Sequence, residues 1–293
     1  MSLSVIGVVG AGFMGSGIAE TVAAARKQVV VYDRDRAALE RSRETIAQSL
    51  RRAITRSRIR REDAERLIGR IRYTTAFPDL SVADAVIEAI PEALGLKREV
   101  FARLDAQLPN AQFLASNTSS IPIAELAAAT TRPERVLGLH FFSPVPVMSL
   151  VEIVLALRTS DAAVAAAEGL VVDIGKQSIR TKDRAGFIVN MLLIPYLMTA
   201  IRMYEEGFAS REDIDTGMKL GCGHPMGPLT LCDFIGLDVL YAICDALYDE
   251  FKRPEYASPP LLKRMVVSGH HGRKSGRGFY DYARSRALTA VAA

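Results

Sequence analysis

The chain has 293 residues, which suffices for two domains or for one large α/β unit at about 100 to 200 residues per domain. Hydrophobic residues make up 49% of the sequence and charged residues 24%. This average globular composition supplies a sizeable core, which excludes general disorder and a small disulfide-stabilised scaffold.

The formal net charge is only +4, but the basic residues are unevenly distributed. Residues 51–72 contain nine arginines and three acidic residues, whereas 28 of the 37 basic and 30 of the 33 acidic residues lie outside this segment. One local patch favours a small anionic ligand over a nucleic-acid surface, so no nucleic-acid partner is expected. From the charges alone, a solvated helix face is the better interpretation of the segment, because such runs of charge are commonly solvated.

The cysteine pattern and the hydropathy indicate a cytoplasmic location. The cysteines are odd in number and form no CxxC pair, as expected in a reducing compartment; they are Cys222, Cys232 and Cys244. The N-terminus has no basic region before its apolar stretch and does not resemble a signal peptide. The most apolar stretch, residues 185–201, is shorter than the ~20 residues of a membrane span, so we expect a buried helix and no membrane partner.

Strands and helices are predicted to alternate in the first part of the chain. Short β-branched runs at 5–9 and 29–32 flank a helical segment at 13–26, which is a βαβ unit. A two-helix segment at 36–70 is longer than a normal crossover and should project as an insertion that carries the arginines. Further strands are predicted at 71–75, 85–90, 113–116, 136–141, 150–155 and 176–181. The alternation predicts a mostly parallel sheet covered on both faces.

After the last predicted strand the pattern becomes helical. Helices are expected at 186–206, after a cap at Ser210 with Asp213 three positions on, and at 237–250. We therefore predict a first domain over 1–184, an all-helical C-terminal domain over 185–283, and a frayed tail over 284–293.

The glycine motif after the first strand predicts a Rossmann-type dinucleotide-binding domain within this α/β fold. Gly10, Gly12 and Gly15 form G-x-G-x-x-G between a strand and a helix, where they permit a tight turn, the approach of a pyrophosphate and close helix packing. Asp33 ends the second strand, where its carboxylate can accept from both ribose hydroxyls and repel a 2′-phosphate. NAD is therefore the expected cofactor, although the neighbouring Arg34 leaves some use of NADP open.

Polar residues at the ends of later strands are candidates for catalysis. The run SNTSS at 116–120 and His140 should both lie at the carboxyl edge of the sheet, where ligands bind in open α/β folds. A histidine can accept the proton when an alcohol is oxidised by hydride transfer, and Glu152 on the next strand could orient it. Spacing alone leaves a structural histidine equally open. We expect no metal, because the spacing of His140 from His224, His270 and His271 is not that of a metal site.

The sequence resembles the short-chain L-3-hydroxyacyl-CoA dehydrogenases, in particular the 3-hydroxybutyryl-CoA dehydrogenase group. The resemblance covers about residues 4–282 and is carried by GAGFMGSGI (10–18), EAIPEALGLKREVF (88–101), SNTSSIP (116–122), HFFSPVPVMSLVEI (140–153), DRAGFIVN (183–190), HPMGP (224–228) and GRKSGRGFY (272–280). It implies reversible NAD-dependent oxidation of an (S)-3-hydroxyacyl-CoA, such as 3-hydroxybutyryl-CoA, to the 3-ketoacyl-CoA.

The resemblance also assigns roles to single residues. It implies that His140 is the general base with Glu152 as its carboxylate partner, and that Ser119 and Asn190 hydrogen-bond the substrate oxygens near C3 and the thioester. Further cofactor contacts fall on Ser119, Glu92, Lys97 and Lys274. The contacts to CoA fall on Ser49 and Arg56, with Arg52 beside them in the arginine segment.

Two positions depart from the pattern of these dehydrogenases. Ser143 stands where they typically have asparagine, so a hydrogen bond on the nicotinamide side or in the catalytic loop is expected to be weaker or lost. Met191 replaces the usual arginine, which we expect to affect the packing of the helical domain more than the chemistry.

Two other functions remain open from the sequence. One is a dehydrogenase of the L-gulonate dehydrogenase and lambda-crystallin group, which would act on a free polyol acid. The other is a non-catalytic dinucleotide-binding protein that retains the fold. A homodimer is also expected, because the helical domain has more apolar residues than one layer can bury: Leu229, Leu231, Phe234, Leu237, Leu240 and Ile243.

Overall fold

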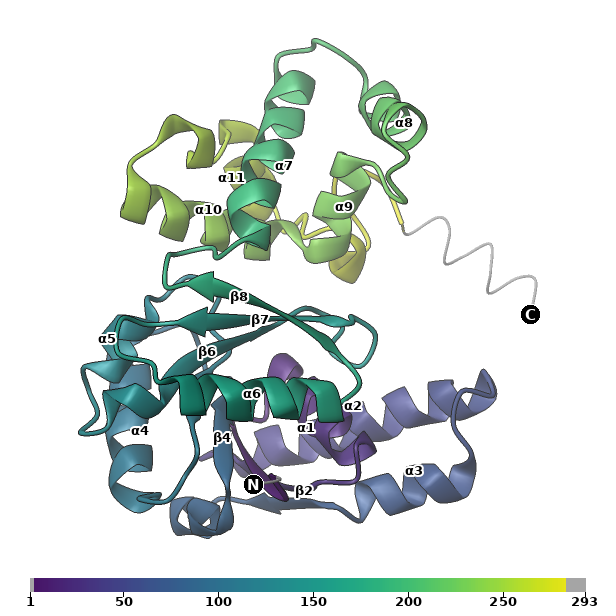
Figure 1. Cartoon of the computed structure of the whole chain (residues 1–293). Helices are drawn as coiled ribbons and strands as arrows, with labels where there is room; N and C mark the ends of the chain where they lie inside the picture. The colour runs from purple at the N-terminus through teal and green to yellow at the C-terminus, as the bar shows by residue number, and fades with distance from the viewer. Residues whose placement is uncertain (1–2, 283–293) are drawn as a thin grey trace. The chain divides into compact units, whose positions relative to one another are not determined.

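The chain folds into two compact units that divide between Phe187 and Ile188 (Figure 1). The computed structural model describes residues 3–282, and the tail predicted at 284–293 lies outside the described residues. The division falls three residues after the predicted end of the first domain at residue 184.

The first unit is built on one eight-stranded sheet. Its strands are β1 (Val5–Val9), β2 (Gln28–Tyr32), β3 (Ile71–Thr74), β4 (Ala85–Glu88), β5 (Leu114–Ser116), β6 (Val136–Phe141), β7 (Leu150–Leu155) and β8 (Gln177–Lys182). The strand order is β3-β2-β1-β4-β5-β6-β7-β8. All neighbours are parallel except β6 and β7, which are antiparallel. The predicted mostly parallel sheet is confirmed, and its antiparallel pair carries the candidate base.

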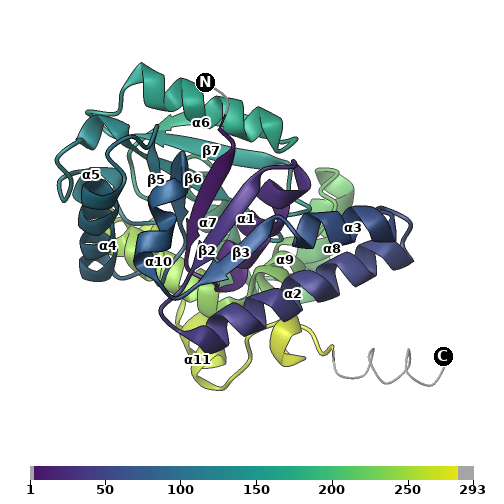
Figure 2. The same cartoon turned by 90° about the horizontal axis from the view of Figure 1, so that it is seen from below.

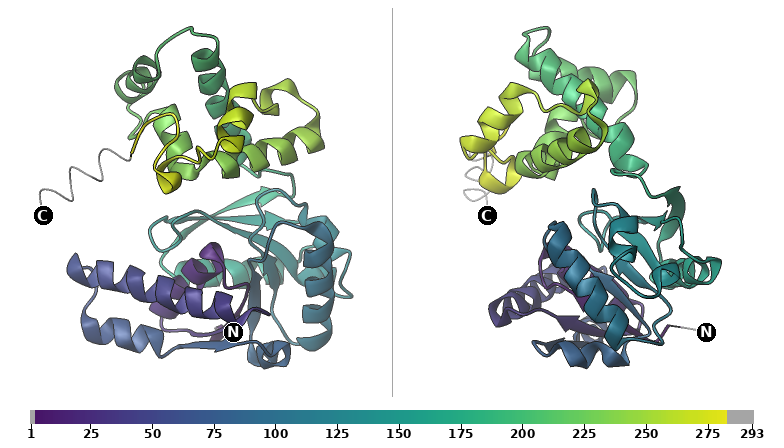
Figure 3. Two further views of the ribbon diagram at one scale, coloured as in Figure 1. Left: turned by 180° about the vertical axis from the view of Figure 1, so that it is seen from behind. Right: turned by 90° about the vertical axis from the view of Figure 1, so that its left-hand side faces the viewer.

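Helices cover both faces of this sheet (Figures 2 and 3). One core cluster joins the strands to α1 (Phe13–Ala24), α2 (Arg36–Thr55), α3 (Arg61–Ile68) and α6 (Asp161–Asp173). The other joins them to η1 (Phe77–Val82), α4 (Leu94–Gln107) and α5 (Ile123–Ala127), and η2 (Pro133–Arg135) precedes β6. Val29 and Val31 of β2 belong to the first cluster and Val30 to the second, as the two-residue period of a strand requires.

The predicted insertion is the connection from β2 to β3, in which α2 and α3 run side by side (Figure 2). Asp35 caps α2 by accepting from the backbone N–H of Ala37 at 2.9 Å. Leu39, Ile46 and Leu50 are buried, and α1 packs against both helices. All nine arginines of the segment except the half-buried Arg70 are exposed. One face of the connection therefore belongs to the core, and the other carries the positive charge.

The second unit is helical. It contains α7 (Val189–Glu205), α8 (Arg211–Gly221), α9 (Pro228–Ile235), α10 (Leu237–Phe251), η3 (Pro254–Tyr256), α11 (Pro260–Val267) and η4 (Arg273–Ser275). The hydroxyl of Ser210 accepts from the N–H of Asp213 at 3.1 Å, so the predicted cap of α8 is present. Within the described residues, no helix is long and apolar enough to cross a membrane.

The apolar residues that suggested a dimer interface lie mostly in the core of the helical unit. Leu229, Leu237 and Leu240 are fully buried where α7, α9 and α10 pack together, and of the six residues only Phe234 is exposed. The expectation that these residues exceed what the helical unit can bury is wrong, whereas the homodimer itself stays a prediction. Sequence periodicity cannot separate a helix face that packs inside the domain from one that packs against another molecule.

Candidate active site

The three glycines after β1 have separate structural roles. Gly10 has φ +105°, and a Cβ there would lie 2.6 Å from the carbonyl oxygen of Ala89. A Cβ at Gly15 would lie 1.9 Å from the carbonyl oxygen of Gly10, so the start of α1 packs directly on the turn. A Cβ at Gly12 would meet nothing within 4 Å, and no side chain caps α1. The backbone at Gly12 is therefore open to a phosphate group at the helix N-terminus.

Asp33 orders the glycine loop as well as marking the end of β2. One carboxylate oxygen accepts from the N–H of Ala11 at 2.8 Å, and the other accepts from the N–H of Asp35 at 3.0 Å. Each carboxylate oxygen has about two acceptor positions, so both retain capacity for a ribose hydroxyl. The open glycine loop and this half-exposed acid fit NAD, which accepts a hydride when bound.

His140 and Glu152 form a cross-strand pair in the antiparallel part of the sheet. The β6–β7 register places them opposite each other, and Nδ1 of His140 lies 2.6 Å from Oε2 of Glu152. His140 is 6% exposed and Glu152 is fully buried. The rings of Phe142 and Phe187 contact the imidazole edge-on, with centroids at 4.6 and 5.3 Å. These contacts fix the orientation of the imidazole.

The pairing decides which histidine nitrogen can act on a substrate. Because Nδ1 is directed at Glu152, Nε2 is the nitrogen available for proton transfer. The buried carboxylate stabilises the imidazolium that forms when Nε2 takes a proton. The predicted pair is therefore assembled in the geometry that a general base requires.

Ser119 lies at the same edge of the sheet. It follows β5, which is parallel to β6, so the loop at 117–121 and the end of β6 share the carboxyl edge. The side-chain oxygen of Asn117 accepts from the N–H of Phe141 at 2.9 Å, and the carbonyl of Ser119 accepts from Gly186 N–H at 3.2 Å. The serine loop is thus tied to the residue after His140.

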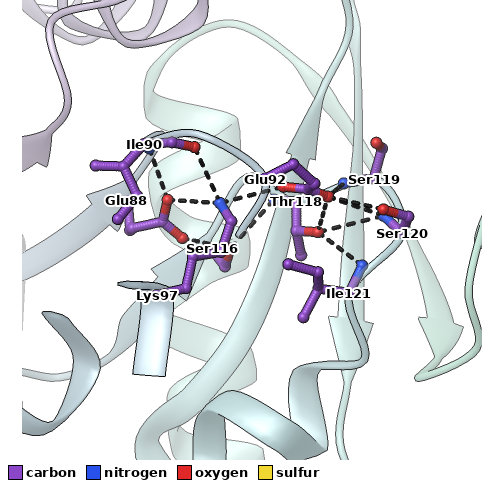
Figure 4. A network of polar contacts seen from close by, with 9 residues as sticks. All are labelled: Glu88, Ile90, Glu92, Lys97, Ser116, Thr118, Ser119, Ser120 and Ile121. Carbon is purple, nitrogen blue, oxygen red and sulfur yellow. Dashed lines mark hydrogen bonds and ion pairs between the residues drawn. The ribbon is translucent and has the colours of Figure 1, made fainter. Parts of the chain in front are cut away.

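Glu92 and Lys97 lie beside this loop (Figure 4). Glu92 accepts hydrogen bonds from the loop, while the Lys97 ammonium is 1% exposed and lies 2.7 Å from Oε1 of Glu88. Both residues are therefore near the predicted cofactor edge, but Lys97 is enclosed by protein.

The residues predicted to bind CoA lie at the C-terminal end of α2, with Ser49 and Arg52 in the helix and Arg56 at its C-cap. Ser49, Arg52 and Arg56 are spaced by three and four positions, and both arginines are exposed. The hydroxyl of Ser49 donates to the buried Glu20 of α1 at 2.8 Å. Burial raises the pKa of the Glu20 carboxyl, while the Ser49 hydrogen bond and the charge of Arg52 act in the opposite direction.

The other predicted site residues lie outside these clusters. Ser143 is exposed just beyond β6, and Asn190 is in the first turn of α7. Lys274, in η4, lies 2.6 Å from the carboxylate of Asp238 within the helical unit. Met191 accepts a hydrogen bond from the Tyr256 hydroxyl at 3.3 Å, which agrees with the expected packing role. Among residues 3–282, no three His, Cys, Asp or Glu side chains are grouped as metal ligands.

The fold, the glycine loop and the acid after β2 define a dinucleotide-binding domain of the Rossmann type. Residues 5–184 match the family model described as 3-hydroxyacyl-CoA dehydrogenase, NAD binding domain, and residues 186–282 match the model for its C-terminal domain. The chain belongs to the 3-hydroxyacyl-CoA dehydrogenase family. The predicted resemblance, enzyme class and NAD cofactor are thereby confirmed.

Relatives with nearly the full length of the chain share this assignment. A 3-hydroxybutyryl-CoA dehydrogenase of Mycobacterium tuberculosis is 51% identical over 94% of this chain and 98% of its own length. The human mitochondrial hydroxyacyl-coenzyme A dehydrogenase is 43% identical over 94% and 90%. The crystal structure of (S)-3-hydroxybutyryl-CoA dehydrogenase from Ralstonia eutropha matches with a TM-score of 0.90 at 45% identity, covering 96% of this chain and all of that one.

Several polar residues of the site were not singled out from the sequence. Glu88, Asn117 and Glu20 are among them, and each interacts with a predicted site residue or its loop. Glu88 ends a four-residue buried strand, where an ionisable residue indicates a partner. That exception to the apolar pattern is the signal that could have identified it.

Proposed function

We propose that this chain oxidises the C3 hydroxyl of (S)-3-hydroxybutyryl-CoA, or a close acyl-CoA homologue, to the ketone. The C3–H bond breaks with its electron pair as a hydride for NAD, and the hydroxyl proton goes to Nε2 of His140. In the reverse direction His140 returns that proton to the carbonyl oxygen. The observation that carries the proposal is the buried His140–Glu152 pair at 2.6 Å at the carboxyl edge of an NAD-binding sheet.

The roles of the other residues follow from their positions. Ser119, in the loop tied to β6, donates to the substrate oxygen at C3, and Asn190 is assigned to the thioester side by its place in the motif. Ser143 offers a shorter hydrogen-bonding group than asparagine beside the nicotinamide. These contacts align C3 for hydride transfer, for which orientation contributes a large part of the rate.

The enzymatic assay distinguishes this proposal from its alternatives. We expect NADH oxidation with acetoacetyl-CoA and no NAD reduction with L-gulonate. Activity with L-gulonate alone would favour a polyol-acid dehydrogenase, and binding of NADH without either activity would indicate a non-catalytic protein. A chain-length series of 3-ketoacyl-CoA substrates then determines the acyl preference.

The position of Asp33 predicts a preference for NADH over NADPH. The Asp33→Ala variant should use NADH less well and show a smaller difference between the two cofactors, because it loses both the ribose acceptor and the repulsion of a 2′-phosphate. Steady-state kinetics with both cofactors checks this. Equal efficiency of the wild type with NADPH would contradict it.

We propose that the arginine segment binds the nucleotide of CoA around Ser49, Arg52 and Arg56. Arg52→Gln combined with Arg56→Gln should raise KM for the acyl-CoA, and more at low salt, because exposed charges are screened over about 8 Å at physiological ionic strength. The control removes two other exposed charges of the same segment, at Arg58 and Arg61. An unchanged KM at low salt would indicate that the arginine segment is a solvated helix face that does not bind CoA.

We propose a homodimer formed through the helical unit, supported by surfaces other than the six residues named from the sequence. Leu192, Phe208, Leu220 and Val267 are 73% to 82% exposed. A mostly apolar groove of about 460 Å³ is lined by Tyr196, Thr199, Ala200, Met203, Ala209, Asp213, Ile214, Gly217, Met218 and Pro228. Light scattering at micromolar concentration should give about twice the chain mass of 31.9 kDa. A monomeric mass would exclude the dimer.

We propose that the protein works in the cytoplasm, with acyl-CoA and its own second copy as partners. The free thiols support a reducing compartment: Cys222 is exposed, while Cys232 and Cys244 are buried. Burial raises the pKa of the Cys244 thiol to about 12, so it stays protonated and unreactive.

A further inference from the structure

A buried ion pair lies between the end of β4 and α4 (Figure 4). The Lys97 ammonium lies 2.7 Å from Oε1 of Glu88, and the two side chains are 1% and 0% exposed. Oε1 of Glu88 also accepts from the N–H of Ile90 at 2.7 Å, and Oε2 accepts from the Ser116 hydroxyl at 2.6 Å. Such a pair is stable only when its remaining hydrogen-bonding positions are filled, as they are here.

The three ammonium protons of Lys97 all have protein acceptors. They are directed to Glu88 Oε1 at 2.7 Å, the carbonyl of Ile90 at 3.2 Å and Oε2 of Glu92 at 3.3 Å. An ammonium group has three donors and no acceptor, so no donor is left for a bound molecule. The position of Lys97 in its motif implies a cofactor contact, but its burial and saturation favour an indirect role.

Glu92 connects the ion pair to the loop that carries Ser119. Its Oε1 accepts from the hydroxyl of Thr118, from Ser119 N–H at 3.2 Å, and from the N–H and hydroxyl of Ser120 at 3.3 and 2.9 Å. The Thr118 hydroxyl in turn accepts from Ile121 N–H at 2.9 Å. One carboxylate oxygen of Glu92 therefore accepts hydrogen bonds from three consecutive residues of the loop and holds them in place.

The charge of Lys97 keeps Glu92 ionised. The Glu92 side chain is 39% exposed, so it is only partly desolvated. That desolvation alone would raise the pKa of the Glu92 carboxyl, but the Lys97 charge and the hydrogen bonds from Thr118 and Ser120 hold that pKa below its ordinary value. An ionised carboxylate makes the stronger hydrogen bonds to backbone N–H groups. The loop therefore keeps its arrangement at mildly acidic pH.

We propose that Lys97 is a positioning residue held by Glu88, and that it acts through Glu92 to fix the 118–121 loop in the conformation that presents Ser119. The consequence for turnover rests on the proposed role of Ser119 in substrate binding. These contacts hold the backbone that carries Ser119, so the position from which its side chain projects is preorganised.

A double-mutant cycle separates this role from direct contact with the cofactor. Lys97→Met should lower kcat/KM for acetoacetyl-CoA by about tenfold, the worth of one charge-assisted interaction, but by less than about twofold when Glu92 is already Gln. NADH affinity, measured by fluorescence titration, should show the same non-additivity. An equal loss of NADH affinity in both backgrounds would mean that Lys97 contacts the cofactor and would overturn the proposal.

The pH profile provides a readout that a merely structural role would not move. In Lys97→Met, the partial desolvation of Glu92 is no longer offset by the Lys97 charge, and only the loop hydrogen bonds still favour the ionised form, so the carboxyl takes up a proton at a higher pH than in the wild type. Activity of the variant should therefore fall relative to the wild type as the pH is lowered from 7 towards ~5. Parallel pH profiles of the two proteins would contradict the coupling.

Hydrogen exchange tests the loop independently of the reaction. The amides of Ser119, Ser120 and Ile121 should exchange faster in Lys97→Met and in Glu92→Gln than in the wild type. Unchanged exchange would overturn the proposal even if acetoacetyl-CoA is the substrate. Conversely, faster exchange in a protein inactive on acetoacetyl-CoA would refute the proposed function and leave the positioning role standing.

Two further variants test whether the effects of Lys97→Met arise only from loss of folding stability. Glu88→Gln combined with Lys97→Met removes both buried charges together, which costs far less than leaving one unpaired. This variant should fold and still show rapid loop exchange. Asp105→Asn is the matched control, because Asp105 is a buried carboxylate of the same α4 helix that binds Thr131 and Arg132. The Asp105→Asn variant should have a lower melting temperature and an unchanged pH profile. If it shifts the pH profile as much as Lys97→Met does, the positioning role is refuted.

Discussion

Replacing His140 with glutamine is expected to reduce kcat by about 10²- to 10⁴-fold, the usual contribution of a positioned general base, while NADH binding is retained. Glutamine can fill much of the space between Phe142 and Phe187 but cannot accept the hydroxyl proton. Fluorescence titration with NADH and single-turnover kinetics separate binding from chemistry. Full activity in this variant would remove His140 from the mechanism.

Glu152→Gln is the companion variant, and it should affect the two directions of the reaction differently. Hydroxyl oxidation requires neutral His140, whereas ketone reduction requires the protonated form. Removing the buried carboxylate weakens the protonated form, so reduction should suffer more than oxidation at pH 7. The measurement is the pH dependence of kcat in both directions, and an equal loss in both would argue against Glu152 as the charge partner.

Alanine at Gly15 is expected to damage both the fold and cofactor binding, whereas alanine at Gly12 should impair only cofactor binding. The new Cβ at position 15 would lie 1.9 Å from a backbone oxygen, so the start of α1 must shift, at a cost of about 1 to 3 kcal/mol in the free energy of unfolding. At position 12 the Cβ meets no protein atom within 4 Å but occupies the space of the pyrophosphate.

Thermal denaturation and NADH titration of the two glycine variants check this contrast. A lower melting temperature is expected for Gly15→Ala, together with weak NADH binding. Wild-type stability is expected for Gly12→Ala, again with weak binding. Tight NADH binding by Gly12→Ala would place the pyrophosphate away from this loop.

Much of the fold could be predicted because local pattern and global structure agree. The β-branched runs of β1 and β2, the glycines between them and the cap at Ser210 are local signals, and each appears in the structure. His140 and Glu152 could be predicted as a pair because His140 ends one predicted strand at the ligand-binding edge and Glu152 lies on the next apolar strand. The antiparallel register that joins them could not be predicted, since it depends on how the chain returns between β6 and β7.

The remaining parts of the site depend on contacts between segments distant in sequence. Glu88 and Ser116 are 28 positions apart, and Glu20 and Ser49 are 29 apart, so neither hydrogen bond leaves a periodic pattern. The apolar residues of α9 and α10 show the opposite problem. Their pattern was clear, but whether Leu237 packs inside the unit or against another chain is decided by the position of α7.

The double engagement of Asp33 limits how the cofactor preference could be redesigned. The same carboxylate that would exclude a 2′-phosphate accepts from the N–H of Ala11, so a change to alanine made to admit NADPH also removes an acceptor that shapes the pyrophosphate turn. Asparagine, which retains a side-chain oxygen, separates these two effects better than alanine does. Selectivity for the ribose and order in the phosphate loop thus both depend on the side chain at position 33. A switch of cofactor that removes its oxygens would need a second substitution to restore the turn.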